Sequence, residues 1–171
     1  MTGIVDYNAG NIRSVERALM TIGADYRISK DPRELAHADR VIFPGVGEAK
    51  FAMGELKKTG FDSFLRDWAA SGKPLLGVCL GSLVIFDHSE ERNTDCLGLI
   101  AGTVRKFPAD FITHGLKIPH MGWNDVHIRN GGSALLAGIP DGSDFYFVHS
   151  YYVDPADPSV ITATADYGFP V

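Results

Sequence analysis

The sequence contains little cysteine, no excess of positive charge and no long apolar run. Its two cysteines, Cys79 and Cys96, indicate reduced thiols rather than a disulfide framework, so we expect a cytoplasmic protein. Sixteen Lys and Arg residues against 21 Asp and Glu residues exclude a basic field of the kind that binds nucleic acid. No run approaches the ~18 apolar residues of a membrane span, and the first residues show no signal-peptide pattern, so we expect no membrane association.

The length of 171 residues is typical of one domain, and we expect a single domain over 1–171. The first half alternates strand patterns with helical patterns. The expected strands there are 2–6, 39–43 and 75–78, and the expected helices are 11–22, 49–57, 61–70 and 80–88. The second half has strand patterns, over 99–107, 115–118, 124–128, 145–153 and 160–165. This order predicts an α/β protein with a mostly parallel sheet and added antiparallel strands.

The strongest local signal surrounds Cys79, which lies between Gly77 and Gly81 where an apolar strand meets a helix. A nucleophile on such a sharp turn needs glycine two residues to either side, because larger side chains would collide with the turn. The N–H groups of the following helix favour thiolate over thiol. The alternative is a small buried core cysteine. The flanking glycines favour the nucleophile.

A second glycine-rich segment, Pro44-Gly45-Val46-Gly47, follows the strand at 39–43. Its backbone N–H groups are suited to an oxyanion hole. A structural turn and a dinucleotide-binding loop are the alternatives, and the dinucleotide pattern is incomplete because Lys50 stands at its last glycine position. The six histidines show no metal-site spacing, so we expect neither a metal nor another cofactor.

Together these segments resemble the class I, or triad, glutamine amidotransferases, and most closely the glutaminase subunits of imidazole glycerol phosphate synthase in histidine biosynthesis. The resemblance covers essentially the whole chain. The segments that carry it are 6–11 (Asp-Tyr-Asn-Ala-Gly-Asn), 44–47, 77–81, 98–102 (Gly-Leu-Ile-Ala-Gly), 118–124 (Ile-Pro-His-Met-Gly-Trp-Asn) and 146–152 (Tyr-Phe-Val-His-Ser-Tyr-Tyr). It implies a flavodoxin-like three-layer α/β fold.

The resemblance also implies a mechanism and a partner. The Cys79 thiolate attacks the side-chain amide of glutamine, and the backbone at Val46, Gly47 and Leu80 holds the oxyanion. Ammonia leaves, and water hydrolyses the glutamyl thioester to glutamate. The ammonia passes to a TIM-barrel cyclase partner, which makes imidazole glycerol phosphate and aminoimidazole carboxamide ribotide.

Further positions take their expected roles from the resemblance alone. The substrate-binding positions are Gly47, Glu91, Ser150 and Tyr151. The positions facing the partner are Asn8, Asn11, His120, Met121 and Trp123.

Two departures from the family pattern bear on activity. Leu83 stands where family members carry a glutamine that binds substrate, four residues after the cysteine. The family's His-Pro-Glu segment, which supplies the general base and its orienting carboxylate, has no counterpart in the sequence. We therefore expect a glutaminase subunit whose C-terminal strand and helix are missing and which is inactive as 171 residues. The alternatives are a catalytically dead homologue that binds the partner and a stand-alone cysteine hydrolase.

Overall fold

The computed structural model describes residues 1–129 and 131–171, apart from the side chains of Ile112 and His114. These residues form two compact units, Met1–Ile100 (unit 1) and Ala101–Val171 (unit 2), and each is described by itself. The expectation of a single domain stays a prediction.

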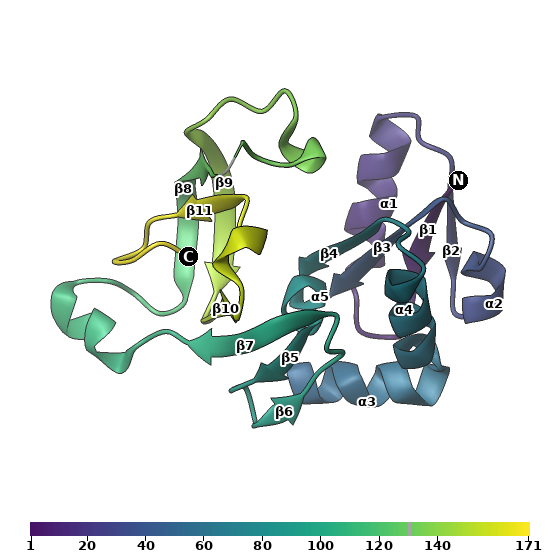
Figure 1. The fold of residues 1–171 in the computed structure, drawn as a ribbon, viewed down its shortest axis with the longest axis horizontal. Coiled ribbons are helices and arrows are strands. Elements are labelled where there is room, and N and C mark those ends of the chain that lie inside the picture. Colours follow the sequence, from purple (N-terminus) through teal and green to yellow (C-terminus); the bar gives the residue numbers. More distant parts are fainter. Residues whose placement is uncertain (130) are drawn as a thin grey trace. The chain divides into compact units, whose positions relative to one another are not determined.

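Unit 1 is built on a four-stranded parallel sheet (Figure 1). Its strands are β1 (Thr2–Val5), β2 (Tyr26–Ser29), β3 (Arg40–Gly45) and β4 (Leu75–Cys79), in the order β2-β1-β3-β4. Every neighbouring pair is parallel. The expected parallel α/β sheet is therefore confirmed, although β2 has no counterpart among the strands expected from the sequence.

The helices of unit 1 connect these strands in βα order. They are α1 (Ile12–Thr21), α2 (Pro32–Leu35), α3 (Ala49–Thr59), α4 (Phe61–Ala70) and α5 (Leu80–Leu83). Gly60, with φ of 76°, ends α3 in the left-handed conformation and separates it from α4. The helices expected over 11–22, 49–57 and 61–70 are confirmed within a few residues at each end.

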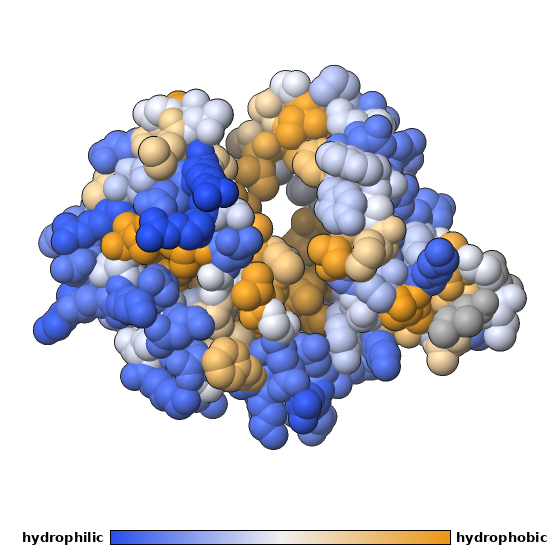
Figure 2. All heavy atoms as spheres, turned by 180° about the vertical axis from the view of Figure 1, so that it is seen from behind, coloured by the Kyte–Doolittle hydropathy of each residue, from blue (hydrophilic) through white to orange (hydrophobic). Residues whose placement is uncertain are grey.

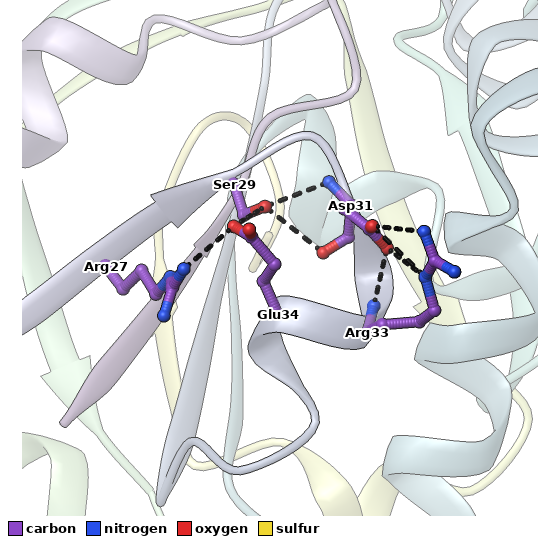
Figure 3. A network of polar contacts seen from close by, with 5 residues as sticks. All are labelled: Arg27, Ser29, Asp31, Arg33 and Glu34. Carbon is purple, nitrogen blue, oxygen red and sulfur yellow. Dashed lines mark hydrogen bonds and ion pairs between the residues drawn. The ribbon is translucent and has the colours of Figure 1, made fainter.

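A polar network shapes the connection from β2 to α2 (Figure 3). The Asp31 side chain accepts a hydrogen bond from the Arg33 backbone N–H at 3.0 Å and caps the helix. The Ser29 hydroxyl donates to Glu34 at 2.8 Å, and Glu34 pairs with Arg27 at 3.2 Å. These polar side chains form hydrogen bonds and an ion pair with one another, and this stabilises the strand and the helix of this polar segment.

The core of unit 1 lies between the sheet and its helices. Its fully buried large side chains come from strands, helices and the loops after them: Ile4, Val5, Tyr7, Leu35, Val41, Phe43, Leu56, Phe61, Leu65, Val84 and Leu97. Burying about ten such side chains contributes on the order of 1.5–3 kcal/mol each before the entropy cost of folding. The sheet is thereby a rigid platform for the residues that follow β3 and β4.

The helix expected over 80–88 is wrong beyond its first turn. It ends at Leu83, and the chain continues into β5 (Phe86–Ser89), which forms an antiparallel pair with β6 (Thr94–Asp95). Backbone N–H groups of residues 97–99 donate to the carbonyls of Val84, Phe86 and Ile85 at 2.7–2.9 Å. In a helix over 80–88 the Val84 carbonyl would bond to the N–H of residue 88, but here it accepts from Leu97, so the helix does not continue.

Unit 2 is mainly antiparallel. Its strands are β7 (Ile100–Lys106), β8 (His120–Ile128), β9 (Ser143–His149), β10 (Tyr151–Pro155) and β11 (Ala163–Ala165), and its 3-10 helices are η1 (Ala109–His114), η2 (Ala134–Leu136) and η3 (Pro158–Val160). One sheet has the order β11-β8-β9, and β10 pairs with β7. The added antiparallel strands are thus confirmed.

An aromatic cluster around Phe107 forms the centre of unit 2. The Phe107 ring lies 5.2–5.7 Å from the rings of His149, Tyr152 and Tyr167, measured between centroids. The expected strand at 115–118 is wrong, because the Lys117 backbone instead bonds at both its N–H and its carbonyl to the Tyr167 hydroxyl. The end of the sequence thereby holds this segment as a loop.

Hydrophobic residues gather in patches on an otherwise largely hydrophilic surface (Figure 2). Within the described residues, no helix is long and apolar enough to cross a bilayer.

Candidate active site and docking face

Cys79 lies at the turn from β4 into α5, with φ of 55° and ψ of −123°. A positive φ is strained for a residue with a side chain, and such strain concentrates at functional sites. The Cys79 side chain is exposed, which contradicts the alternative of a buried core cysteine. Its place at the carboxyl end of a parallel sheet is where open α/β sheets bind their ligands.

The two flanking glycines are required by close packing. A Cβ on Gly77 would lie 2.8 Å from the Ser82 Cα, and one on Gly81 would overlap the carbonyl oxygen of Phe43. The Ser82 hydroxyl donates a hydrogen bond of 2.7 Å to the Cys79 carbonyl. These contacts hold the strand, the turn and the helix tightly together and confirm the physical reason given for the glycines.

The glycine-rich segment 44–47 begins within β3 and lies beside this turn, because Gly45 and Cys79 are partners in the β3–β4 register. Gly47 has φ of 93°, a conformation that favours glycine. The Val46 N–H donates to the Ala9 carbonyl at 2.9 Å, so Val46 can bind an oxyanion only after exchanging that hydrogen bond. The Leu80 N–H begins α5 and has no intrahelical acceptor.

Tyr7 lies next to the turn at Cys79, and no pattern in the sequence around Tyr7 predicts this position. Its ring is fully buried, and its hydroxyl lies 2.7 Å from the place of a Cβ on Gly45, next to the Gly81 backbone. Among the described residues this hydroxyl has no hydrogen-bond partner. Burial, with a smaller contribution from Cys79, raises the pKa of Tyr7 well above its usual value, so the phenol stays neutral.

Glu91 fastens the start of α3. Its carboxylate accepts a hydrogen bond of 2.7 Å from the Ala49 N–H, and the neighbouring Arg92 pairs with Glu48 at 2.6 Å. The structure therefore shows Glu91 in a structural contact next to the glycine-rich segment. Its expected contact with substrate stays a prediction.

Cys96 differs from Cys79 in its environment. It is 6% exposed and packs in the core of unit 1. Burial raises the pKa of the Cys96 thiol to about 11, and the nearby Asp95 and Glu91 add to this rise. Among the described residues, no group of three or more His, Cys, Asp or Glu side chains is arranged to hold a metal ion.

Unit 2 presents an exposed face on β8 and β9. Met121 is 60% and Trp123 71% exposed, and their partners in register, Val148 and Tyr146, are 52% and 56% exposed. Trp123 and Tyr146 meet edge to face at 5.6 Å between centroids. We call these four residues the β8–β9 outer face. Solvent-exposed aromatic and aliphatic side chains in one group are typical of a protein–protein contact.

His120 lies on the opposite face of β8 and is only 3% exposed. Side chains alternate along a strand, so His120 and Asn124 point away from the face that carries Met121 and Trp123. This burial gives the His120 side chain little surface for a partner, and its expected place facing the partner stays a prediction. The His120 ring contacts His149 through a hydrogen bond of 3.0 Å between ring nitrogens.

Ser150 and Tyr151 mark the passage from β9 to β10. The Ser150 carbonyl accepts from the Phe107 N–H at 3.1 Å, and the Tyr151 carbonyl accepts from the His149 ring at 2.8 Å. Both expected substrate-binding positions thus have a fixed backbone within unit 2.

Asn8 and Asn11 lie at the amino-terminal side of α1 in unit 1. Asn8 is exposed, has φ of 70°, and bridges Lys30 and Glu55 through its amide at 2.9 and 3.2 Å. Asn11 is the exposed N-cap residue of α1, and its side chain makes no capping hydrogen bond. Both are accessible, as their expected contact with a partner requires.

Comparisons with known proteins agree with this arrangement. Residues 3–169 match the family described as glutamine amidotransferase class-I. The chain therefore belongs to the class-I glutamine amidotransferase family.

Among individual relatives, the chain is similar to the imidazole glycerol phosphate synthase subunit HisH. It is 45% identical to that subunit of Dehalococcoides mccartyi, with 98% of this chain and 80% of the relative aligned. It is 46% identical to that of Rhodopirellula baltica over the same shares of each chain. A crystal structure of a glutamine amidotransferase, 17% identical, superimposes with a TM-score of 0.74 over 99% of this chain and 82% of that one, which shows the shared fold.

Proposed function

We propose that this protein is the glutaminase subunit of imidazole glycerol phosphate synthase in histidine biosynthesis. The observation that carries the proposal is Cys79, exposed on a strained turn beside a glycine-rich backbone segment. The similarity to the HisH subunits selects the pathway. A cytoplasmic location, expected from the two free cysteines, is part of the same proposal.

The chemistry is an acyl transfer to sulfur followed by hydrolysis. The Cys79 Sγ forms a bond to the amide carbon of glutamine, and the carbon–nitrogen bond breaks to release ammonia with a proton taken up on nitrogen. Water then attacks the glutamyl thioester, which yields glutamate and restores the thiol. The Leu80 and Gly47 N–H groups are the donors suited to the oxyanion formed in each step.

Proton transfer needs a general base, and no histidine of the described residues is assigned to that role. His120 and His149 bond to each other on the inner face of unit 2, and His88 pairs with Asp95. General acid–base groups contribute roughly 10²–10⁴-fold to a rate. We therefore propose that the polypeptide of residues 1–171 releases glutamate far more slowly than an extended chain, in which the C-terminal segment of the HisH relative from Dehalococcoides mccartyi is joined to residue 171.

The test is glutamate release by the extended chain mixed with the TIM-barrel cyclase and its ligand. Cys79→Ser should abolish release, because the nucleophile is lost, while Cys96→Ser should leave it unchanged. If the extended wild-type chain binds the cyclase but releases no glutamate, the partner-binding alternative is correct instead. Equal turnover by the 171-residue and extended chains would show that a histidine within these residues is the base.

The β8–β9 outer face is the proposed docking surface for the cyclase. Trp123→Ala should weaken binding about tenfold or more, since exposed tryptophans that become buried dominate interface energies. Its effect on the free energy of unfolding should stay within about 0.5 kcal/mol, because the side chain is 71% exposed. Leu135→Ala, at a 66% exposed position outside this face, is the matched control. Unchanged binding by Trp123→Ala would place the interface elsewhere.

A further inference from the structure

The inner face of β8 and β9 holds a pair of histidines that the proposed chemistry does not use. His120 and His149 are directly opposite each other in the antiparallel register. Their rings are joined from His120 Nδ1 to His149 Nε2 at 3.0 Å. The pair continues at both ends, to the Asn124 side chain and to the Tyr151 carbonyl.

One arrangement of protons satisfies the whole chain of hydrogen bonds. The Tyr151 carbonyl can only accept, so His149 Nδ1, at 2.8 Å, carries a proton. In the neutral ring, His149 Nε2 is then an acceptor, and His120 Nδ1 must donate to it. His120 Nε2 is left to accept from the Asn124 amide nitrogen at 3.3 Å. The same Asn124 nitrogen donates to the Asp166 carbonyl at 2.8 Å, which fixes the orientation of the amide.

Aromatic rings enclose this pair. The His120 ring stacks on Tyr167 at 3.8 Å and on Phe147 at 4.7 Å between centroids, with interplanar angles of 20° and 15°. Burial lowers the pKa of His120, helped by the neighbouring His149, and burial also lowers the pKa of His149. Burial therefore favours the neutral form of both imidazoles, which is the form that this arrangement of hydrogen bonds requires.

Among the described residues, the titratable and charged groups next to the pair come from three segments. From the segment after β11, Tyr167 bonds through its hydroxyl to the Lys117 backbone, and the Asp166 carboxylate accepts from the Gly168 N–H at 3.0 Å. Beside β7, Phe107 packs on the His149 ring at 5.2 Å and carries no charge. From β10, Tyr151 presents its carbonyl. Within this set, the two imidazoles are the groups whose protonation, below the usual pH range of imidazole, would break the chain of hydrogen bonds.

The chain of hydrogen bonds joins two places that matter for the proposed function. One end is the Tyr151 carbonyl, next to Ser150, and these are the expected substrate-binding positions. The other end lies on β8, whose outward side chains Met121 and Trp123 form part of the proposed docking face. His120 and Asn124 lie on one face of β8, and Met121 and Trp123 lie on the other. All four side chains are attached to the same strand, so a displacement of β8 at the docking face also displaces the histidine pair.

We propose that Asn124, His120 and His149 are positioning residues, which hold the Ser150–Tyr151 backbone for glutamine and tie it to the docking strand. This inference rests on the proposed function for its substrate. Protonation of His149 would place two donors face to face, at His120 Nδ1 and His149 Nε2, and protonation of His120 would turn a donor on its Nε2 toward the Asn124 amide nitrogen, so either event breaks the chain that ends at the Tyr151 carbonyl. Glutamine binding should therefore weaken as the pH falls, whereas the cysteine chemistry itself does not depend on the pair.

The first test is nitrogen-15 NMR of the histidine rings in the extended subunit, which needs no activity. We expect both rings to be neutral with the proton on Nδ1 at pH 7, and to stay so to lower pH than a blocked histidine peptide. On protonation, the amide signals of Ser150 and Tyr151 should shift. A proton on Nε2 of either ring at pH 7, or amide signals that do not respond, would overturn the proposal.

The second test is His120→Phe, which keeps the stacked ring and removes both hydrogen bonds. His127→Phe, at an exposed histidine on the other face of the same strand, is the matched control. In the complex with the cyclase, His120→Phe should raise KM for glutamine roughly fivefold, change kcat little and remove the rise of KM at low pH. An unchanged KM would overturn the positioning role. If no variant and no wild-type complex releases glutamate, the proposed function fails, and the ring and amide signals still decide this inference.

Discussion

Gly81 lies so close to the Phe43 carbonyl oxygen that a Cβ atom at Gly81 would overlap it. The contact joins α5, which follows Cys79, to the neighbouring strand β3. Gly81→Ala must push these segments apart, and we expect the free energy of unfolding to fall by about 3 kcal/mol. Urea unfolding measures the loss.

Gly54→Ala is the control for this prediction. Gly54 lies inside α3, and a Cβ there would meet nothing within 4 Å. Alanine is the better helix former, so this variant should gain about 0.5–1 kcal/mol. Similar effects of the two substitutions would contradict the steric explanation for the glycine after Cys79.

The buried Tyr7 hydroxyl gives a prediction of the opposite sign to most core changes. Because it has no partner among the described residues, Tyr7→Phe should leave the free energy of unfolding unchanged or raise it by up to about 1 kcal/mol. The matched variant is Tyr167→Phe, whose hydroxyl bonds to the Lys117 carbonyl at 2.7 Å and should cost about 1 kcal/mol. A loss in Tyr7→Phe as large as in Tyr167→Phe would reveal a partner for Tyr7.

The two thiols should differ sharply in reactivity. Cys79 is exposed, whereas Cys96 is buried and its pKa is raised to about 11. At pH 8 only about one Cys96 thiol in a thousand is then ionised, and the thiolate is the reactive form. Limiting iodoacetamide should label Cys79, as mapped by mass spectrometry, and Cys79→Ser should abolish labelling of the folded chain. Preferential labelling of Cys96 would show that Cys79 is not the reactive thiol.

The periodicity of the sequence predicts local elements well where neighbours along the chain determine them. The helix at Phe61–Ala70 and the turn at Cys79 follow from an apolar stripe and from two glycines. The helix expected over 80–88 fails because residues 97–99 bond to the carbonyls of Val84, Ile85 and Phe86. Such long-range pairing leaves no local signal.

The residues of the candidate site also divide into those that local sequence patterns predict and those that they do not. Tyr7 lies on a loop far along the chain from Cys79, so the sequence around Tyr7 does not predict that it is buried next to the Cys79 turn. For His120, alternation separates it from Met121 and Trp123 only in the structure, because β8 begins at residue 120 whereas the sequence predicts a strand only from residue 124. The family resemblance alone placed His120 on the partner side.

Leu83 offers a test of substrate binding. It lies on α5 and packs in part against the core of unit 1, at the position where the family resemblance implies a substrate-binding glutamine. In the extended chain with its cyclase, Leu83→Gln should lower KM for glutamine about fivefold, because an added hydrogen bond to the ligand contributes about 1 kcal/mol. Leu83→Met, which adds no amide, is the control. A KM that stays the same or rises would show that this position does not contact substrate.

Asp125 and Asp144 face each other across β8 and β9 and give a pH-dependent prediction. A hydrogen bond from the protonated Asp144 to Asp125 raises the pKa of Asp144 above its usual value, and burial and the nearby Asp125 charge add to the rise. The folded state therefore binds this proton more tightly than the unfolded state. The stabilisation is fully present below the pKa of Asp144 in the unfolded chain and is lost as the pH rises through its higher folded pKa. Asp144→Asn should remove this loss, so Tm at pH 7 minus Tm at pH 3 becomes larger than in the wild type. Asp110→Asn, at a carboxylate of η1 away from this pair, controls for net charge. An equal increase in both variants would show that overall charge, rather than this pair, determines the pH dependence.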